Sequence, residues 1–242
     1  MIDLHTHVLP GIDDGARTLD DSLDMARAFV SDGVTAIAAT PHMRDDYPTS
    51  ADVMLRAVDQ LRQVLDQEVI PLTVHSGAEL AVEWLPRLSE SELRRLTLAG
   101  GGRYVLVETP YHGWPTTIVE GLLRIRRAGC TPVLAHPERN AVVQESPSVL
   151  APLVRGGTLV QVTAASLDGR LGRGSRDTAL RLIDAGLAHL MASDAHTPEV
   201  RMAGMRSALE AIRDESLARW LVTDVPRALV EGRDPPPRPS SS

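Results

Sequence analysis

Short apolar runs alternate with segments of helical spacing along most of the chain. Runs rich in apolar or β-branched residues predict seven strands, at residues 1–4, 35–39, 72–75, 104–107, 132–135, 158–162 and 188–192. Between most of these runs, apolar residues recur every three or four positions, which predicts helices at residues 19–30, 53–65, 117–128, 148–154 and 175–185. Glycine follows several of the predicted helices, as is common where a helix leads into a strand.

Strands joined by helices predict a parallel β/α fold, either a barrel or a doubly wound sheet. No glycine-rich turn follows the first strand, which disfavours a dinucleotide-binding Rossmann fold. The Pro- and Ser-rich end of the chain, DPPPRPSSS, predicts a disordered tail over residues 233–242. We therefore expect one domain over residues 1–232, followed by this tail.

Composition narrows the function classes. The 242 residues include 25 basic and 32 acidic side chains, a net charge of −7 that argues against broad nucleic-acid binding. No apolar run reaches the ~20 residues that span a bilayer, and no basic-then-apolar signal opens the chain. We therefore expect a cytoplasmic protein that neither inserts into a membrane nor binds nucleic acid, with self-association left open.

Histidines and carboxylates gather at the ends of the predicted strands. His5 and His7 lie two residues apart, so their side chains share one face. Further metal-competent residues follow later strands or the first loop, namely Asp13, Asp14, His42, Glu79, Glu108, His136, Asp194 and His196. Because active sites in parallel β/α folds form at the carboxyl ends of the strands, these residues predict a metal site.

The residue types indicate which metals and which chemistry to expect. Imidazole and carboxylate ligands without thiolate suit Zn²⁺, Mn²⁺ or Fe²⁺ rather than Ca²⁺ or Cu⁺. The number of candidates exceeds what one ion needs, so two or three ions are expected, and such clusters typically hydrolyse phosphate esters. The single cysteine, Cys130, has His136 rather than arginine six residues later, which excludes the Cys-x5-Arg motif of cysteine-dependent phosphatases.

Six motifs carry a family resemblance, namely MIDLHTHVLPGIDDGA, AATPH, SGAE, LAHPERN, QVTAASLDGRLG and ASDAH. In order and spacing they resemble the PHP (polymerase and histidinol phosphatase) superfamily, and within it the bacterial capsule-system tyrosine phosphatases of the CpsB/YwqE type. The resemblance implies a distorted (β/α)7 TIM-like barrel with its metal site at the carboxyl ends of the strands. It also implies hydrolysis of phosphotyrosine on the tail of a bacterial tyrosine kinase that controls polysaccharide export.

The resemblance further implies three sets of ligands. One ion would be held by His5, His7, Glu79 and Asp194, a second by Glu79, Glu108 and His136, and a third by Asp14, His42 and His196. The choice of Asp14 over Asp13 rests on the resemblance, because the residues alone do not separate them. It implies Mn²⁺ as the expected ion, with Fe²⁺ or Zn²⁺ as alternatives, and two phosphate-binding arginines, Arg139 and Arg201.

This chemistry requires that the charge of the phosphate be neutralised. Divalent ions and the forked guanidinium groups of Arg139 and Arg201 can neutralise it. A metal-bound water, with a pKa of ~7, is then expected to attack phosphorus. The tyrosine leaving group has a pKa of ~10 and needs less protonation than an alkoxide.

Three other functions compete with this prediction. The first is a small-molecule phosphatase of the same superfamily, such as a histidinol phosphatase, which the GIDDG and QVTAASLDG motifs disfavour. The second is a nuclease-type module, which the acidic charge and the lack of basic stretches with interleaved aromatics disfavour. The third is a silent metal-binding interaction module, which the complete set of candidate ligands disfavours.

Overall fold

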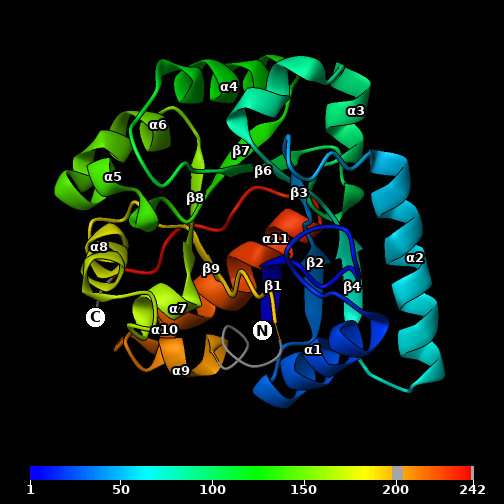
Figure 1. Cartoon of the computed structure of the whole chain (residues 1–242). Helices are drawn as coiled ribbons and strands as arrows, with labels where there is room; N and C mark the ends of the chain where they lie inside the picture. Colours follow the sequence, from blue (N-terminus) through cyan, green and yellow to red (C-terminus); the bar gives the residue numbers. More distant parts are fainter. Residues whose placement is uncertain (198–203, 241–242) are drawn as a thin grey trace.

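Parallel strands surrounded by helices form the α/β fold of the computed structural model (Figure 1), which describes residues 1–197 and 204–240. The strands are β1 (Ile2–Thr6), β2 (Ala36–Ala39), β3 (His42–Met43), β4 (Thr73–Ser76), β5 (Glu79–Leu80), β6 (Tyr104–Glu108), β7 (Thr131–Ala135), β8 (Leu159–Thr163) and β9 (Leu190–Ala192). The helices are α1 (Leu19–Asp32), α2 (Ala51–Gln67), α3 (Glu90–Arg95), α4 (Thr116–Arg127), α5 (Ala141–Glu145), α6 (Ala151–Arg155), α7 (Ala164–Leu167), α8 (Arg173–Asp184), α9 (Met205–Leu209), α10 (Glu215–Arg219) and α11 (Val225–Val230). A short 3-10 turn, η3 (Pro137–Arg139), follows β7.

The strand pairings follow the order expected for a TIM-like barrel. One sheet has the order β1-β2-β4, and the other has the order β3-β5-β6-β7-β8-β9, with every pairing parallel. A bridge between Thr6 and Ala195 joins the segment after β9 to β1, and Asp194 N–H donates to His5 O at 2.9 Å. Helices α1, α2, α4 and α8 lie outside the strands (Figure 1). The predicted α/β fold with parallel strands is confirmed.

All seven predicted strands are present, but two of them continue after a break. Thr40 and Pro41 separate β2 from β3, and Gly77 and Ala78 separate β4 from β5. Pro41 has no amide hydrogen to donate to a neighbouring strand, although its carbonyl accepts from Glu79 N–H at 3.1 Å. The sequence analysis did not predict β3 and β5, because a strand of two residues shows no periodicity. These two strands carry His42 and Glu79, so the breaks lie directly before two of the predicted metal ligands.

The predicted helix ends follow local capping chemistry. The Thr18 side chain accepts from Asp21 N–H at 3.1 Å, and the Asp21 carboxylate accepts in return from Thr18 N–H, which starts α1. Gly33 ends α1 with φ of 87°, a left-handed conformation that glycine adopts without steric cost.

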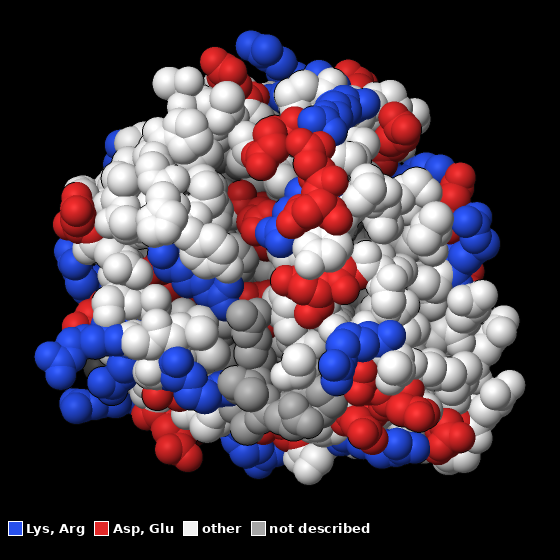
Figure 2. Space-filling model, viewed as in Figure 1, with Lys and Arg blue, Asp and Glu red and all other residues white. Residues whose placement is uncertain are grey.

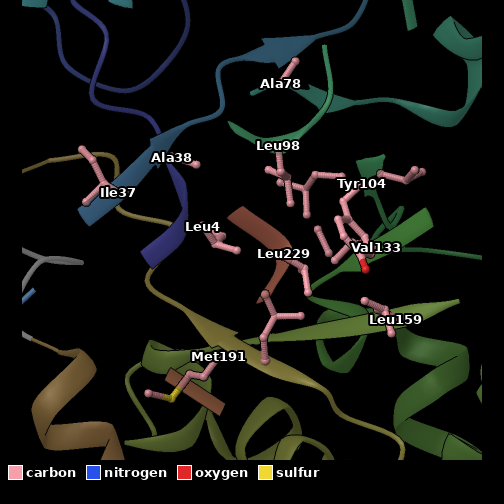
Figure 3. Packing of buried hydrophobic residues seen from close by; sticks show 14 of the residues in the cluster. Leu4, Ile37, Ala38, Ala78, Leu98, Tyr104, Val133, Leu159, Met191 and Leu229 are labelled. Carbon is pink, nitrogen blue, oxygen red and sulfur yellow. The ribbon is translucent and has the colours of Figure 1, made fainter. Parts of the chain in front are cut away.

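The last helix packs against the strands inside the protein. Leu229 of α11 is fully buried and lies between Leu4 of β1 and Val133 of β7 (Figure 3). Tyr104 at the start of β6 donates its hydroxyl to Arg233 O, just beyond α11, whereas Glu108 ends the same strand. Helix α11 and the chain that follows it therefore cover the end of the strands opposite the predicted metal ligands.

The C-terminal segment makes specific contacts with the rest of the protein, and the predicted disorder of the tail stays a prediction. Residues 233–240 form neither a helix nor a strand, and Pro236 O accepts from the indole N–H of Trp220 at 3.0 Å. The carbonyl of Gly232 accepts from Arg103 Nη1 at 2.6 Å, and Asp234 pairs with the same guanidinium. Composition alone does not reveal such contacts, because they depend on backbone carbonyls that any sequence supplies. The domain boundary at residue 232 stays a prediction.

We expect Leu229→Ala to lower the free energy of unfolding by about 2–5 kcal/mol, because it leaves a cavity among fully buried side chains. Chemical denaturation would measure the change. Leu123→Ala is the matched control, since Leu123 is 46% exposed on α4 and its truncation should change stability by less than about 0.5 kcal/mol. Equal losses in the two variants would contradict the role of α11 in the core.

Candidate metal centre

All nine predicted metal ligands lie in one cluster at the carboxyl ends of the strands. They fall into four overlapping groups, within each of which the candidate ligand atoms lie within 4.8 Å of one another. The groups are His7, Asp14, His42 and His196; His5, Glu79 and His136; His5, His7 and Asp194; and His42, Glu79 and Glu108. The groups overlap more than the three implied sets, because His5, His7, His42 and Glu79 each belong to two of them.

Two of the clustered residues have left-handed backbone conformations that place them at the strand ends. His136 directly follows β7 with φ of 36°, and Asp194 follows β9 after one residue with φ of 55°. Such conformations cost about 1–3 kcal/mol in residues other than glycine and occur preferentially at functional sites. Backbone hydrogen bonds hold both turns, since His136 N–H donates to Gln161 O and Asp194 N–H donates to His5 O, each at 2.9 Å.

The histidines of the first strand have fixed ring orientations. His5 Nδ1 lies 3.0 Å from Gln161 Oε1, and His7 Nδ1 lies 2.7 Å from Asp13 Oδ2. Because both of these oxygens are acceptors, each Nδ1 donates, and each Nε2 is left to bind a cation or a proton. The two Nε2 atoms face each other at 3.2 Å, inside the buried cluster.

This arrangement fits divalent ions. The two Nε2 atoms also lie 3.3–3.5 Å from Glu79 Oε2 and from Asp194 Oδ1. Four acceptor atoms at such distances repel one another unless protons or cations lie between them. The mixture of imidazole and carboxylate donors suits Mn²⁺, Fe²⁺ or Zn²⁺. The residues present therefore fit a multinuclear metal site.

The pKa shifts of His7 and Glu79 also show that the cluster favours positive charge. Burial disfavours charge on His7, but its hydrogen bonds to Asp13 and Asp194 outweigh this effect and hold its pKa well above the usual range. Burial likewise opposes ionisation of Glu79, yet nearby His5 and His42 keep its pKa well below the usual range. Glu79 therefore stays ionised and holds positive charge beside it.

Asp13 and Asp14, which the sequence did not separate, have different contacts. Asp14 Oδ1 lies 3.4 Å from His196 Nε2 and 3.5 Å from His42 Nε2, within the first group. Asp13 instead orients His7 and accepts from His42 N–H at 2.9 Å. The contacts of Asp13 are those of a residue that orients a ligand, and those of Asp14 are those of a ligand.

Of the two predicted phosphate-binding arginines, Arg139 lies within the described residues. Its side chain is 7% exposed, and its Nη2 lies 2.7 Å from Asp194 Oδ2. Its Nη1 donates to the Tyr111 hydroxyl at 3.3 Å. The other predicted arginine, Arg201, lies outside the described residues.

Arg44 is a second cation at the centre, and the sequence analysis assigned it no role. Its Nη1 donates to Glu108 Oε1 at 2.9 Å, and its Nε lies 2.8 Å from Asp46 Oδ1. Burial and the neighbouring Glu79 raise the pKa of Glu108 to about 7, against the opposing effect of His42 and Arg44. Nothing in the local sequence distinguishes Arg44 from other surface arginines.

Glu138 is a buried carboxyl group that the sequence analysis also left without a role. Its Oε1 accepts from Thr163 N–H at 2.9 Å and from Ser166 Oγ at 2.7 Å, and burial raises its pKa. It thereby anchors the η3 turn, which lies between His136 and Asn140, to the end of β8. The position of Glu138 in the HPER motif, between the predicted site residues His136 and Arg139, is the sequence feature that could have predicted a role for it.

Comparisons with known proteins show the family of this chain. The family described as "Capsular polysaccharide synthesis, CpsB/CapC" matches residues 1–231. The tyrosine-protein phosphatase YwqE of Bacillus subtilis is 38% identical over 216 residues, covering 89% of this chain and 85% of the relative. The tyrosine-protein phosphatase CpsB of Streptococcus pneumoniae is 26% identical over 239 residues, covering 95% and 98%.

Solved structures give the same result. A chain from a study of YwqE from B. subtilis and CpsB from S. pneumoniae, described as unique metal-dependent tyrosine phosphatases, superposes with a TM-score of 0.87. It is 35% identical and covers 100% of both chains. A β-aspartyl dipeptidase from Fervidobacterium islandicum, with a TM-score of 0.56 and 16% identity over 95% of this chain and 74% of its own, shares the fold alone. The chain therefore belongs to the CpsB/CapC family of capsular polysaccharide synthesis proteins, whose members include metal-dependent tyrosine phosphatases.

Proposed function

We propose that this protein hydrolyses phosphotyrosine on a protein substrate, the tail of a bacterial tyrosine kinase, and thereby regulates capsule or exopolysaccharide production. The observation that carries this proposal is the cluster of five histidines and four carboxylates, most of them buried, at the carboxyl ends of the strands. Similarity to named tyrosine phosphatases over most of the chain supports the choice of substrate.

We propose two or three divalent ions as the cofactor, with Mn²⁺ favoured and Fe²⁺ or Zn²⁺ as alternatives. His5, His7, Glu79 and Asp194 would hold one ion, Glu79, Glu108 and His136 another, and Asp14, His42 and His196 the third. When bound, the ions supply charge neutralisation for the phosphate and activation of water. Glu79 is suited to bridge two ions because it is fully buried and each of its carboxylate oxygens faces a different histidine.

Within this mechanism, the protein's own residues bind and orient the phosphate. Arg139 can donate to phosphate oxygens, because its guanidinium reaches the cluster at Asp194 and the opening of the site at Tyr111. We propose the same role for Arg201. Asp13 and Gln161 would keep His7 and His5 in the tautomers that leave Nε2 available. Burial of most of the cluster limits its contact with bulk water and strengthens these electrostatic interactions.

The described residues contain no helix long and apolar enough to cross a bilayer. The cytoplasmic location expected from the sequence stays a prediction.

Initial rates under Mn²⁺ on a phosphotyrosine peptide, histidinol phosphate and single-stranded DNA would test the proposed function. We expect clear preference for the peptide, loss of activity on chelation, recovery with Mn²⁺, and two to three metal equivalents by elemental analysis. A preference for histidinol phosphate would refute the substrate assignment. Full activity in protein stripped of metal would refute the metal mechanism.

We expect His136→Ala to lower kcat/KM by about 100-fold or more, because a metal ligand contributes several kcal/mol to stabilising the transition state. His75→Ala is the matched control, since His75 lies half-buried on β4 outside the four groups and should retain activity within about twofold. Metal content measured beside the rates would show whether the loss follows the ions. Similar losses in both variants would argue against a special role for His136.

We expect Asp13→Ala to weaken metal binding by about 10- to 100-fold, because it removes the acceptor that orients His7. Isothermal titration of metal-stripped protein with Mn²⁺ would measure the effect. Asp24→Ala, a change on the exposed face of α1, should leave the affinity unaltered. Unchanged affinity in Asp13→Ala would show that the orientation of His7 does not limit metal binding.

A further inference from the structure

A hollow of about 600 Å³ opens beside Glu108, at the edge of the metal cluster. Its polar lining includes Arg44, Glu83 and His112, and its apolar lining includes Pro110 and Tyr111. Figure 2 shows acidic side chains, with basic ones among them, gathered near the centre of the face that it presents. The volume falls within the ~300–1,000 Å³ of small-molecule sites, so the hollow can hold a substrate side chain outside the metal cluster.

Tyr111 supplies the aromatic surface of this hollow. The whole chain contains three Tyr, three Trp and one Phe, and of these Tyr111 lines the hollow, where His112 adds an imidazole ring. Tyr111 is 47% exposed, whereas the other six Tyr, Trp and Phe residues are buried or half-buried. Packing in the core does not explain an exposed ring in a chain so poor in aromatics. The Tyr111 ring lies beside the cluster of candidate metal ligands, a position that favours a role in binding.

The position of Tyr111 relates the hollow to the predicted phosphate site. Its hydroxyl accepts from Nη1 of Arg139, and the Nη2 of the same guanidinium lies 2.7 Å from Asp194. Its ring is nearly parallel to that of His136, with an angle of 5° and a centroid distance of 6.3 Å. A phosphate that contacts Arg139 would therefore place the group attached to it close to the Tyr111 ring.

The backbone of Tyr111 is held in place before any substrate binds. The amide group of Asn140 donates to Pro110 O at 2.6 Å and to Gly113 O at 2.8 Å. The next residue, Ala141, donates its N–H to Tyr111 O at 3.1 Å. These bonds fix the loop after β6 to the start of α5, so that little conformational entropy is lost when a substrate ring packs on Tyr111.

We propose that Tyr111 forms the wall against which the ring of the substrate phosphotyrosine packs, and that this contact selects aryl over alkyl phosphates. The inference rests on the proposed function and names the residue that determines its specificity. Two aromatic rings gain from burial and from offset or edge-to-face contact, which the side chains of phosphoserine and phosphothreonine cannot provide. Tyr111 is a specificity residue, and its hydroxyl is not needed for this role.

Steady-state kinetics on two peptides that differ only in phosphotyrosine or phosphoserine would test this role. We expect Tyr111→Ala to raise KM for the phosphotyrosine peptide about tenfold, with kcat and the rate on phosphoserine nearly unchanged. Tyr111→Phe should keep the selectivity of the native protein, because it keeps the ring. Equal losses in Tyr111→Ala and Tyr111→Phe would instead assign Tyr111 the task of positioning Arg139, and would overturn the proposal.

Tyr47→Ala is the matched aromatic control, since the Tyr47 ring stacks on His42 at 5.9 Å but does not line the hollow. Its ratio of phosphotyrosine to phosphoserine turnover should equal that of the native protein, and a tenfold fall would contradict the assignment to Tyr111. Metal content should be the same in all variants.

Calorimetry of phenylphosphonate and methylphosphonate binding to the metal-loaded protein tests the packing of a ligand ring on Tyr111 without any hydrolysis. We expect the native protein to bind phenylphosphonate more tightly than methylphosphonate, and Tyr111→Ala to lower this ratio of affinities about tenfold. An unchanged ratio would refute the proposed role of Tyr111. If the native protein hydrolysed no phosphotyrosine peptide, the proposed function would be refuted. The binding measurement would still show whether an aromatic ring packs on Tyr111.

Discussion

A fully buried carboxylate, Glu79, is the constraint on which the site depends. Removing a carboxylate from water costs several kcal/mol, and the surrounding side chains must offset that cost. Imidazole nitrogens of His5, His7, His42 and His136 lie within 3.5 Å of its oxygens. These histidines come from the ends of three strands, β1, β3 and β7, so the charge of Glu79 is compensated only when the whole fold has formed. The same electrostatic demand makes the cluster suitable for divalent ions.

The two ends of the strands have opposite chemistry. At the amino ends, Leu4, Tyr104 and Leu229 form part of an apolar core that the last helix covers (Figure 3). At the carboxyl ends, the side chains are charged, and the backbone at His136 and Asp194 adopts costly conformations. Parallel β/α folds separate stability from chemistry in this way. The free energy gained by burying apolar side chains at the amino ends can offset the cost of backbone strain and buried charge at the carboxyl ends.

Much of the fold and of the candidate site could be predicted from the sequence. Alternating apolar runs predicted every long strand, and glycines such as Gly33 marked helix ends, because both signals are local. His5, His7 and the later ligand candidates could be found because parallel strands bring their carboxyl ends together. The breaks that create β3 and β5 could not be predicted, since two residues show no pattern. Arg44 could not be predicted either, because its role depends on Glu108, 64 residues away.

The sequence by itself determined the fold class, the family resemblance and the candidate ligands, with Asp13 and Asp14 not separated, because strand spacing and residue chemistry are properties of the chain. Only the tertiary structure decided what each side chain contacts. It distinguished Asp13, which orients His7, from Asp14, which faces His42 and His196. It also placed Tyr111 against Arg139 and brought the C-terminal segment onto Trp220. These roles depend on distances of a few ångströms between residues far apart in the chain, and only the packing of the folded protein sets such distances.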